Sequence, residues 1–357
     1  MTRDRVNEID LLRFIAAFAV VLFHYTFRGT AANSMTVMPY PLLAPIFKYG
    51  YLGVELFFII SGFVILMTAD SGSLRKFFVA RVVRLYPAFW ICCTLTFAAI
   101  LLFGAPRFSA TWPQYLMNMT LLSEFFDVKS IEGVYWSLFV EIRFYVLVAL
   151  VLVIGKIRHA QWFLVCWLAA SIALEIAPHW RLNYLFVVDY SAFFIAGATF
   201  YLVWSKGLDI AKAGILLASW GLAVYESLGR LPRFEQQFHG DLGAVVVAAI
   251  VTAFFAVMWL VSLRATGFFG RKNWLAVGAV TYPLYLLHEN IGFIIFNNAY
   301  PAINAHVLLW GTVALVIALS YGVHVWVERQ YSPILKDALN RGIDRLARIA
   351  GRTPSAS

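Results

Sequence analysis

The sequence predicts an all-α polytopic membrane protein with about ten spanning helices. Composition is the first reason: 62% of the 357 residues are hydrophobic and only 13% carry a charge. Soluble proteins carry roughly a quarter charged residues. The second reason is that the apolar residues form runs of the length that crosses a bilayer, about 20 residues each. The alternating segments typical of a membrane barrel are not found in the sequence.

The apolar runs follow one another along the chain and are joined mostly by short loops. We place them at 10–28, 50–68, 85–104, 134–155, 160–176, 185–204, 212–228, 241–263, 274–297 and 305–327. The first is a permanent span rather than a cleaved signal, because Arg13 and His24 interrupt it and no small-residue cleavage site follows. Pro87 is expected to open the third span, where its missing N–H is tolerated.

The distribution of positive charge predicts the orientation. Of the 28 Lys and Arg residues, 19 fall in segments on the same side as the N-terminus, 7 fall on the opposite side, and two lie within spans. Positive residues favour the cytoplasmic side. Both termini are therefore predicted to be cytoplasmic. The net charge of +9 follows from this topology, and its dispersal over many loops argues against nucleic-acid binding.

Two parts are predicted: a transmembrane domain over 1–328 and a basic amphipathic tail over 329–357. In the tail, apolar residues recur at helical spacing with Lys and Arg between them, namely Leu335, Leu339, Ile343, Leu346 and Ile349. This pattern predicts a helix on the cytoplasmic membrane surface. The final "TPSAS" is predicted to be disordered. The three cysteines fall within spans without metal-ligand spacing, so no metal site is predicted.

Two ionisable residues bracket the stretch "RFIAAFAVVLFH" of the first span. Arg13 and His24 are eleven positions apart, which places them on nearly one helix face and about 16 Å apart along the axis. A charge at the bilayer centre costs at least about 2.5–3.5 kcal/mol, so such residues face a protein-lined cavity. The alternative is that Arg13 extends to the lipid headgroups and His24 only bonds a neighbouring helix.

Carboxylates of the second and fourth spans are expected near the depth of His24. Glu55 lies in "GVELFFIISGF", and Glu141 follows Trp136 and Ser137 in "WSLFVE". A carboxylate beside an imidazole orients the ring and raises its basicity, so we expect Glu55 or Glu141 to hold His24. Ser61 and the next residue, Gly62, are expected where two helices approach closely.

Arginines are expected at the cytoplasmic end. Arg81 and Arg84 in "RVVRLYP" are three positions apart and so point the same way on a helix. They lie at about the depth predicted for Arg13. Since guanidinium forks suit phosphate, the three form a candidate anion site. Glu328 is expected to brace these arginines.

The ninth span carries further polar residues in "TYPLYLLHEN". Tyr282 and His288 are candidates to support the site, whereas Glu289 is expected to face elsewhere. Arginines at the inner mouth and a histidine about 16 Å further out match a donor with a phosphorylated head and a reactive group on a long arm. Coenzyme A thioesters have this shape.

The motifs also resemble a known family, the integral-membrane acyltransferase-3 family. Four carry the resemblance in the family's order: Arg13-x10-His24, "GVELFFIISGF" (53–63), "RVVRLYP" (81–87) and "WSLFVE" (136–141). "TYPLYLLH" (281–288) resembles a fifth. The sequence departs from the family pattern where Thr281 replaces the usual serine and Ile142 a second acidic residue.

The resemblance implies a transmembrane O-acyltransferase of the bacterial inner membrane. It would move an acyl group, usually acetyl, from cytoplasmic acetyl-CoA to a hydroxyl of a cell-surface or lipid-linked glycan. Acetyl-CoA is then a substrate, and no cofactor is bound. Carried over by position, the catalytic residues are His24, Arg13 and Glu141, and the acyl-CoA ligands are Arg13, Arg81 and Arg84. The acceptor-binding or supporting residues are Glu55, Ser61, Trp136, Ser137, Tyr282 and His288.

Several alternatives stay open on the sequence. His24 acts either as general base for the acceptor hydroxyl or as a nucleophile that forms an acyl-histidine. A secondary transporter of a small polar or anionic solute would also carry buried ionisable residues, although the sequence has no internal repeat of the kind many transporters show. A binding or regulatory membrane protein is a further alternative. The acceptor is not indicated by any loop.

Overall fold

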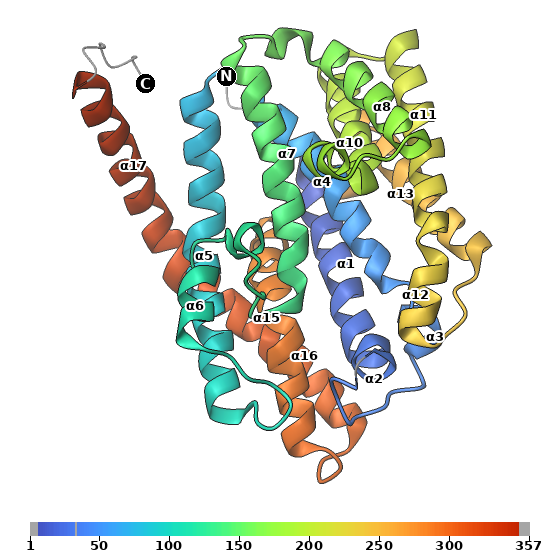
Figure 1. Ribbon diagram of the computed structural model, residues 1–357, viewed down its shortest axis with the longest axis vertical. Coiled ribbons are helices and arrows are strands. Elements are labelled where there is room, and N and C mark those ends of the chain that lie inside the picture. Colours follow the sequence, from blue (N-terminus) through green and yellow to red (C-terminus); the bar gives the residue numbers. More distant parts are fainter. Residues whose placement is uncertain (1–5, 33, 350–357) are drawn as a thin grey trace.

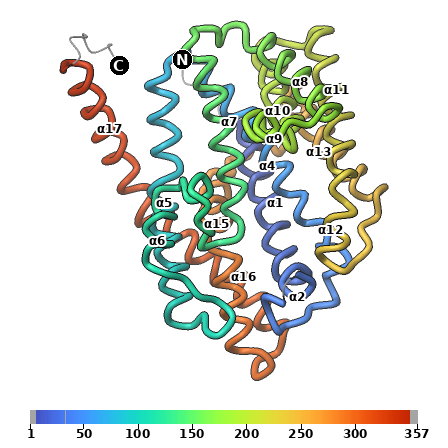
Figure 2. Tube along the Cα trace, viewed as in Figure 1, coloured from blue at the N-terminus to red at the C-terminus, as the bar shows by residue number. Residues whose placement is uncertain are grey.

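The computed structural model describes residues 6–32 and 34–349, and this part of the chain is helical and contains no strand. Its long helices run roughly along one axis, and most chain neighbours are antiparallel (Figures 1 and 2). They are α1 (Asn7–Phe23), α4 (Gly53–Ala69), α5 (Leu74–Phe103), α7 (Trp136–Val153), α8 (Ala160–Ile176), α10 (Val188–Lys206), α11 (Ile210–Gly229), α13 (Ala244–Ser262), α15 (Leu275–Ala299), α16 (Ala305–Val323) and α17 (Arg329–Ile349).

Short helical segments cap and connect these long helices. They are the π-helix η1 (His24–Arg28), α2 (Gly29–Ala31), α3 (Ala44–Phe47), η2 (Gly50–Leu52), α6 (Trp112–Asn118), η3 (Ser123–Phe126), η4 (Gly133–Tyr135), η5 (Ile157–His159), α9 (Trp180–Phe186), α12 (Leu231–Phe238), α14 (Phe268–Arg271) and the π-helix η6 (His324–Glu328).

Each of the ten predicted runs coincides with one of the long helices. Eight helical segments of the described chain are long and apolar enough to cross a membrane. α11 and α15 are not among the eight. In α15 the consecutive polar residues His288, Glu289 and Asn290 lower the mean hydropathy. An all-α membrane protein is confirmed, while the count of ten spans and the cytoplasmic location of the termini stay predictions.

The third span differs from its prediction at its start. α5 begins at Leu74, where the Ser73 side chain accepts a hydrogen bond from the Lys76 N–H, and this cap starts the helix eleven residues before the predicted residue 85. Pro87 therefore lies inside α5, so the expectation that it opens the span is wrong. The early start places Arg81 and Arg84 on the helix.

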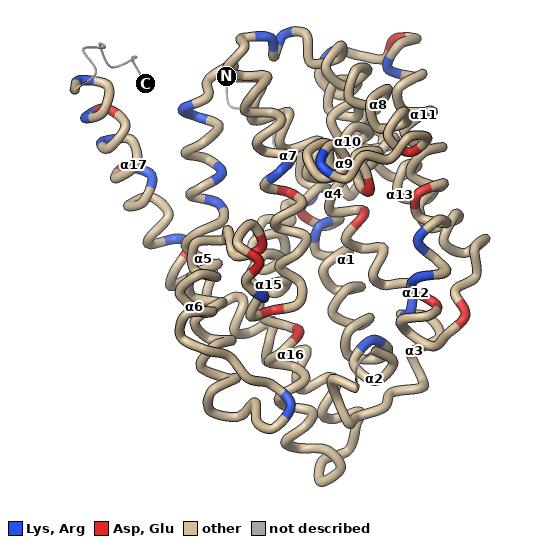
Figure 3. The backbone as a smooth tube through the Cα atoms, viewed as in Figure 1, with Lys and Arg blue, Asp and Glu red and all other residues tan. Residues whose placement is uncertain are grey.

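The predicted amphipathic tail is helical over its described part. α17 continues from α16 through η6, and none of its residues is buried. Its far end pairs with the start of α5, where Arg75 donates to Asp344 at 2.6 Å. Lys and Arg gather on these two helix ends at the top of the view (Figure 3). A location on the membrane surface and a domain boundary at 328 stay predictions, and "TPSAS" lies outside the described residues.

The centre of the bundle is the crossing of α4 and α10, and it depends on two glycines. A Cβ on Gly197 would lie 1.8 Å from the Ile59 carbonyl oxygen, and one on Gly62 would lie 2.2 Å from the Phe194 carbonyl oxygen. Small residues permit such close approach of membrane helices. Gly62 therefore has the packing role that its sequence predicted, and α4 is held in the position from which Glu55 and Ser61 reach the polar interior.

Gly197→Ala is expected to destabilise the bundle, because its new methyl group would force α4 and α10 apart. Overpacking of this kind costs about 1–3 kcal/mol, so the midpoint of thermal unfolding in detergent should fall. The matched control is Gly214→Ala on α11, where a Cβ meets no atom within 4 Å. Equal unfolding midpoints for the two variants would contradict this account of the crossing.

Candidate active site

Many ionisable residues of the interior line two adjoining cavities. The outer cavity, of about 380 Å³, is lined by His24, Glu55, Trp136 and Glu289, among others. The inner cavity, of about 60 Å³, is lined by Arg13, Arg81, Arg84, Ser61, Ser137, Glu141 and Tyr282, among others. Both are also lined by Val54 and Tyr285. The two polar layers that the sequence predicts are thus present as two cavities. We call them the outer and the inner chamber, because the predicted orientation places the second nearer the cytoplasm.

His24 occupies the point where α1 becomes the π-helix η1. Its Nδ1 lies 2.8 Å from the Val20 carbonyl oxygen and 3.2 Å from Nε2 of His288. The Nδ1 of His288 lies 2.9 Å from the Tyr285 carbonyl oxygen. Carbonyls only accept, so both Nδ1 atoms carry the hydrogen. This fixes the tautomer of His24 and leaves the lone pair on its Nε2.

Glu289 is the carboxylate nearest to that free nitrogen. Its Oε1 lies 3.7 Å from Nε2 of His24, and its side chain is fully buried. The same oxygen accepts a hydrogen bond from Arg28. The expectation that Glu289 faces elsewhere is wrong. His288 and Glu289 diverge by about 100° on α15, yet both reach His24 because they contact opposite edges of its ring.

A close approach of α1 and α15 makes this arrangement possible. A Cβ on Gly292 would lie 2.3 Å from the Tyr25 ring, so only glycine fits there. The Tyr25 hydroxyl donates to the His288 carbonyl at 2.7 Å. The π-helical turn adds to the effect, since both His24 and Arg28 reach Glu289 from it. Single π-turns within helices are frequent at functional sites.

The two carboxylates that the sequence assigns to His24 bind other groups. Glu55 accepts from Arg230 at 2.5 Å and from Ser227 at 3.2 Å. Glu141 lies in the inner cavity and accepts from Ser61 at 2.5 Å. The structure therefore brings neither Glu55 nor Glu141 to the imidazole, and Glu289 takes that place.

The inner cavity gathers the arginines as predicted. Arg84 pairs with Glu328 at 3.2 Å, which confirms the expected brace, and its guanidinium lies 5.1 Å from the centre of the Tyr282 ring. Arg81 donates to Thr68 at 3.2 Å, and its Nε has no partner in the described chain. Arg84 is neutralised by Glu328, and Glu141 is a carboxylate of the same cavity. Arg81 forms no ion pair in the described residues, so its guanidinium is the one suited to an anion.

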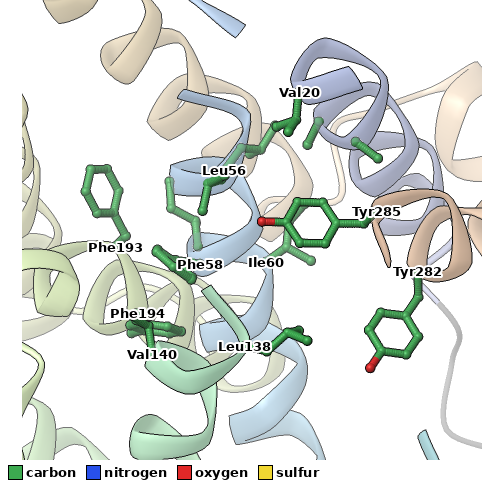
Figure 4. Close-up of a cluster of buried hydrophobic side chains, with 14 of the residues drawn as sticks. Val20, Leu56, Phe58, Ile60, Leu138, Val140, Phe193, Phe194, Tyr282 and Tyr285 are labelled. Carbon is green, nitrogen blue, oxygen red and sulfur yellow. The ribbon is translucent and has the colours of Figure 1, made fainter. Parts of the chain in front are cut away.

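Tyr285 stands at the junction of the two cavities. Its hydroxyl and that of Ser137 are 2.7 Å apart. Figure 4 shows the Tyr285 ring extending from α15 toward α4, whereas the Tyr282 ring points away from α4. The two chambers therefore meet at a hydrogen-bonded pair of side chains. Ser137 contacts the junction and Trp136 lines the outer chamber, while their roles stay predictions.

The site residues expected from the sequence do not include Arg28, Glu289, Tyr285 or Arg230. Arg28 and Arg230 fall among the seven positive residues predicted for the outer segments, and Tyr285 lies in the ninth-span motif beside Tyr282 without a predicted role. The usable signal was the run "HEN", since three consecutive polar residues inside an apolar helix need partners on more than one side. No cluster of three His, Cys, Asp or Glu in the described chain has the arrangement of a metal site.

A bundle of apolar helices around a buried histidine, paired carboxylates and a set of arginines defines a multi-pass membrane protein with an internal polar site. The model of the acyltransferase-3 family, described as an acyltransferase domain, matches residues 6–327. The chain belongs to this family, and it is an acyltransferase-type membrane protein. The resemblance inferred from the motifs is thereby confirmed.

Individual relatives are distant in sequence. Nodulation protein 10 of Rhizobium leguminosarum bv. viciae is 27% identical, with 89% of this chain and 91% of that protein covered. O-acetyltransferase OatA of Staphylococcus aureus is 26% identical, with 82% of this chain and 51% of OatA covered. A putative acetyltransferase, ORF330, of Acidianus two-tailed virus is 28% identical over 42% of each chain. No solved structure matches this chain.

Arg28→Gln is expected to destabilise the protein, because it leaves the buried Glu289 carboxylate without its partner. Breaking a buried pair costs about 3–5 kcal/mol. The double variant Arg28→Gln/Glu289→Gln should lose less than the sum of the two single variants, since neither charge then remains. Thermal unfolding of all four proteins measures this coupling. Arg107→Gln, at an exposed arginine that donates to the Ser34 carbonyl, is the control, and strict additivity would refute the pair's role.

Proposed function

We propose that this protein is an O-acyltransferase that moves an acyl group, in the simplest case acetyl, from cytoplasmic acyl-CoA to a hydroxyl of a cell-surface or lipid-linked glycan. It would do so across the bacterial inner membrane. One observation carries the proposal: His24, whose Nδ1 lies against the Val20 carbonyl and His288, lines the outer chamber together with Glu289. This chamber adjoins an arginine-lined inner chamber at Tyr285.

The inner chamber supports acyl-CoA as donor. Arg13, Arg81 and Arg84 would bind the phosphates of the nucleotide head through guanidinium forks. The pantetheine arm would then extend past Tyr285 toward His24. A chamber of 60 Å³ is smaller than this arm. Donor binding in this scheme requires Tyr285 or Val54 to move, with loss of the Ser137–Tyr285 hydrogen bond.

The outer chamber supports a glycan as acceptor. Aromatic side chains form part of its wall, and the rings of Trp136 and Tyr190 are 5.5 Å apart. Flat apolar rings beside polar groups suit a sugar, which has both apolar and hydroxyl faces. OatA is named an O-acetyltransferase, and membership of the acyltransferase family favours transfer over solute transport.

In the proposed reaction, Nε2 of His24 takes the proton of the acceptor hydroxyl as that oxygen attacks the thioester carbonyl. The tetrahedral intermediate then collapses with cleavage of the C–S bond. The coenzyme A thiolate leaves and takes the proton back from His24. Glu289 stabilises the imidazolium that forms between these steps. Arg28 holds this carboxylate in place, and His288 keeps the ring oriented through its Nδ1 edge.

A covalent acyl-histidine remains the competing route, because the same lone pair on Nε2 could attack the thioester. The two routes differ in one measurable respect. Labelled acetyl-CoA without acceptor leaves label on the protein only if an acyl-histidine forms.

The proposal is tested by supplying labelled acetyl-CoA to the cytoplasmic face of membranes with and without this protein. Label is expected in an envelope glycan only when the protein is present. Uptake of a solute without thioester cleavage would replace the proposal with transport.

His24→Ala and Arg13→Ala are expected to insert normally and to abolish detectable acyl transfer. Loss of a general base removes about 10²–10⁴-fold of rate, whereas loss of Arg13 should weaken acetyl-CoA binding. Product formation and binding of labelled acetyl-CoA to purified protein separate the two defects. Arg143→Ala is the matched control, because Arg143 packs on Tyr184 outside both chambers. Retained acceptor acetylation by His24→Ala would remove this mechanism.

Glu289→Gln is expected to lower kcat by about 10²-fold, the usual effect of removing one preorganised electrostatic group. Its KM values should change little, because the carboxylate acts on the imidazolium and not on either substrate. Steady-state rates with varied acetyl-CoA and varied acceptor measure this split. A rise in KM with unchanged kcat would instead assign Glu289 to substrate binding.

A further inference from the structure

We infer that the acceptor carries an anionic group, a carboxylate or a phosphate, which binds Arg233 and Gln237 of α12 in the outer chamber. This inference rests on the proposed function and names the chemistry of its acceptor. It starts from the charges that line the outer chamber: the guanidiniums of Arg28, Arg230 and Arg233 and the carboxylates of Glu55 and Glu289.

Two of the three guanidiniums are already neutralised inside the protein. Arg28 pairs with Glu289, and Arg230 pairs with Glu55. Both carboxylates are almost fully buried, with 0% and 4% of their side chains exposed. These two pairs hold the chamber wall together and leave no charge free for a ligand.

Arg233 is different. It is exposed, it lines the chamber, and no side chain in the described part of the chain bonds or pairs with its guanidinium. Gln237 also lines the chamber, is exposed, and makes no side-chain hydrogen bond within the described residues. Four positions apart on α12, the two lie on one helix face. Together they present a charged fork and an amide with nothing on the protein to satisfy them.

The position of these two side chains is fixed by the apolar residues of the same short helix. Phe234 packs on Tyr51 with ring centres 4.8 Å apart, and Phe238 packs on Phe23 at 5.6 Å. Phe23 is the residue directly before His24. α12 is thus anchored to the end of α1 and forms a wall of the chamber that contains the catalytic nitrogen. A group bound at Arg233 would belong to the acceptor molecule or to a neighbouring unit of its chain.

The chemistry of the free groups selects an anion. A guanidinium donates two parallel hydrogen bonds to a carboxylate or phosphate, and this charge-assisted geometry is stronger than a bond to a neutral hydroxyl. A site for a neutral sugar would need no unpaired positive charge. A lipid headgroup phosphate would offer the same chemistry, so the experiment must separate the two sources.

The test uses the full-length protein in phosphatidylcholine vesicles, prepared with and without an anionic phospholipid. Labelled acetyl-CoA and glycans extracted from the envelope of the source organism are added to both. Labelled products are separated on an anion exchanger. We expect the wild type to label the acidic fraction, and Arg233→Gln to lower that labelling about tenfold, equivalent to one charge-assisted hydrogen bond. Raised salt should increase the KM for the acceptor more in the wild type than in Arg233→Gln, because only the wild type has a positive charge at this position to attract an anionic acceptor.

Arg181→Gln is the matched control. Arg181 is exposed, stacks on Trp180 and lines neither chamber, so its variant should label as the wild type does. Label confined to neutral glycans, or equal labelling by Arg233→Gln, would overturn the inference while the proposed function stands. An effect of Arg233→Gln that occurs only with anionic lipid in the vesicles would assign the site to a headgroup and also overturn it. Absence of label from every fraction would overturn the proposed function itself.

Discussion

The ion pair between Arg28 and Glu289 is the interaction on which the site depends. A carboxylate with no exposed surface needs a partner, because an isolated buried charge is very costly. Arg28 supplies that partner from η1, and Glu289 supplies the charge from α15. The pair ties the outer end of α1 to the middle of α15. His24 lies one helical turn from Arg28, so the same contact sets where its imidazole stands relative to His288 and Glu289.

The geometry of the helices makes this contact possible. Gly292 lets α15 approach Tyr25, and Gly62 with Gly197 let α4 approach α10. In a membrane, where lipid is as apolar as the side chains, close packing and internal hydrogen bonds replace the hydrophobic driving force between helices. These glycines therefore set the distances between the helices. They decide which polar side chains come within bonding distance of one another.

The arrangement of two chambers also has a physical logic. Arginines and Glu141 line one chamber, and His24 with Glu289 lines the other. Val54 and the hydrogen-bonded Tyr285 stand between them. A protein that performs chemistry within a membrane must not leave an open aqueous path through it. A junction formed by two side chains meets that requirement. In the proposed reaction, the donor would displace them only while it fills the passage.

The sequence by itself determined the class of protein, the positions of the long helices and the presence of two polar layers. Composition and run length predicted an all-α membrane protein, and the spacing of Arg13 with His24 and of Arg81 with Arg84 predicted two polar layers, which the structure contains as two cavities. Such features are local, because helix length and face follow from residues a few positions apart.

Only the tertiary structure decided which group each carboxylate contacts. Glu55 goes to Arg230, Glu141 to Ser61, and Glu289, rather than either of them, to His24. Helix crossings set these pairs, and a sequence shows on which face of its own helix a side chain lies but not the depth or rotation at which the next helix meets it. The π-turn at His24 was not predicted for the same reason, because its side chains meet α15, far away in the chain. The helical start at Leu74 is different: the Ser73 cap that sets it is local, and it lies ahead of the apolar run from which the span was predicted.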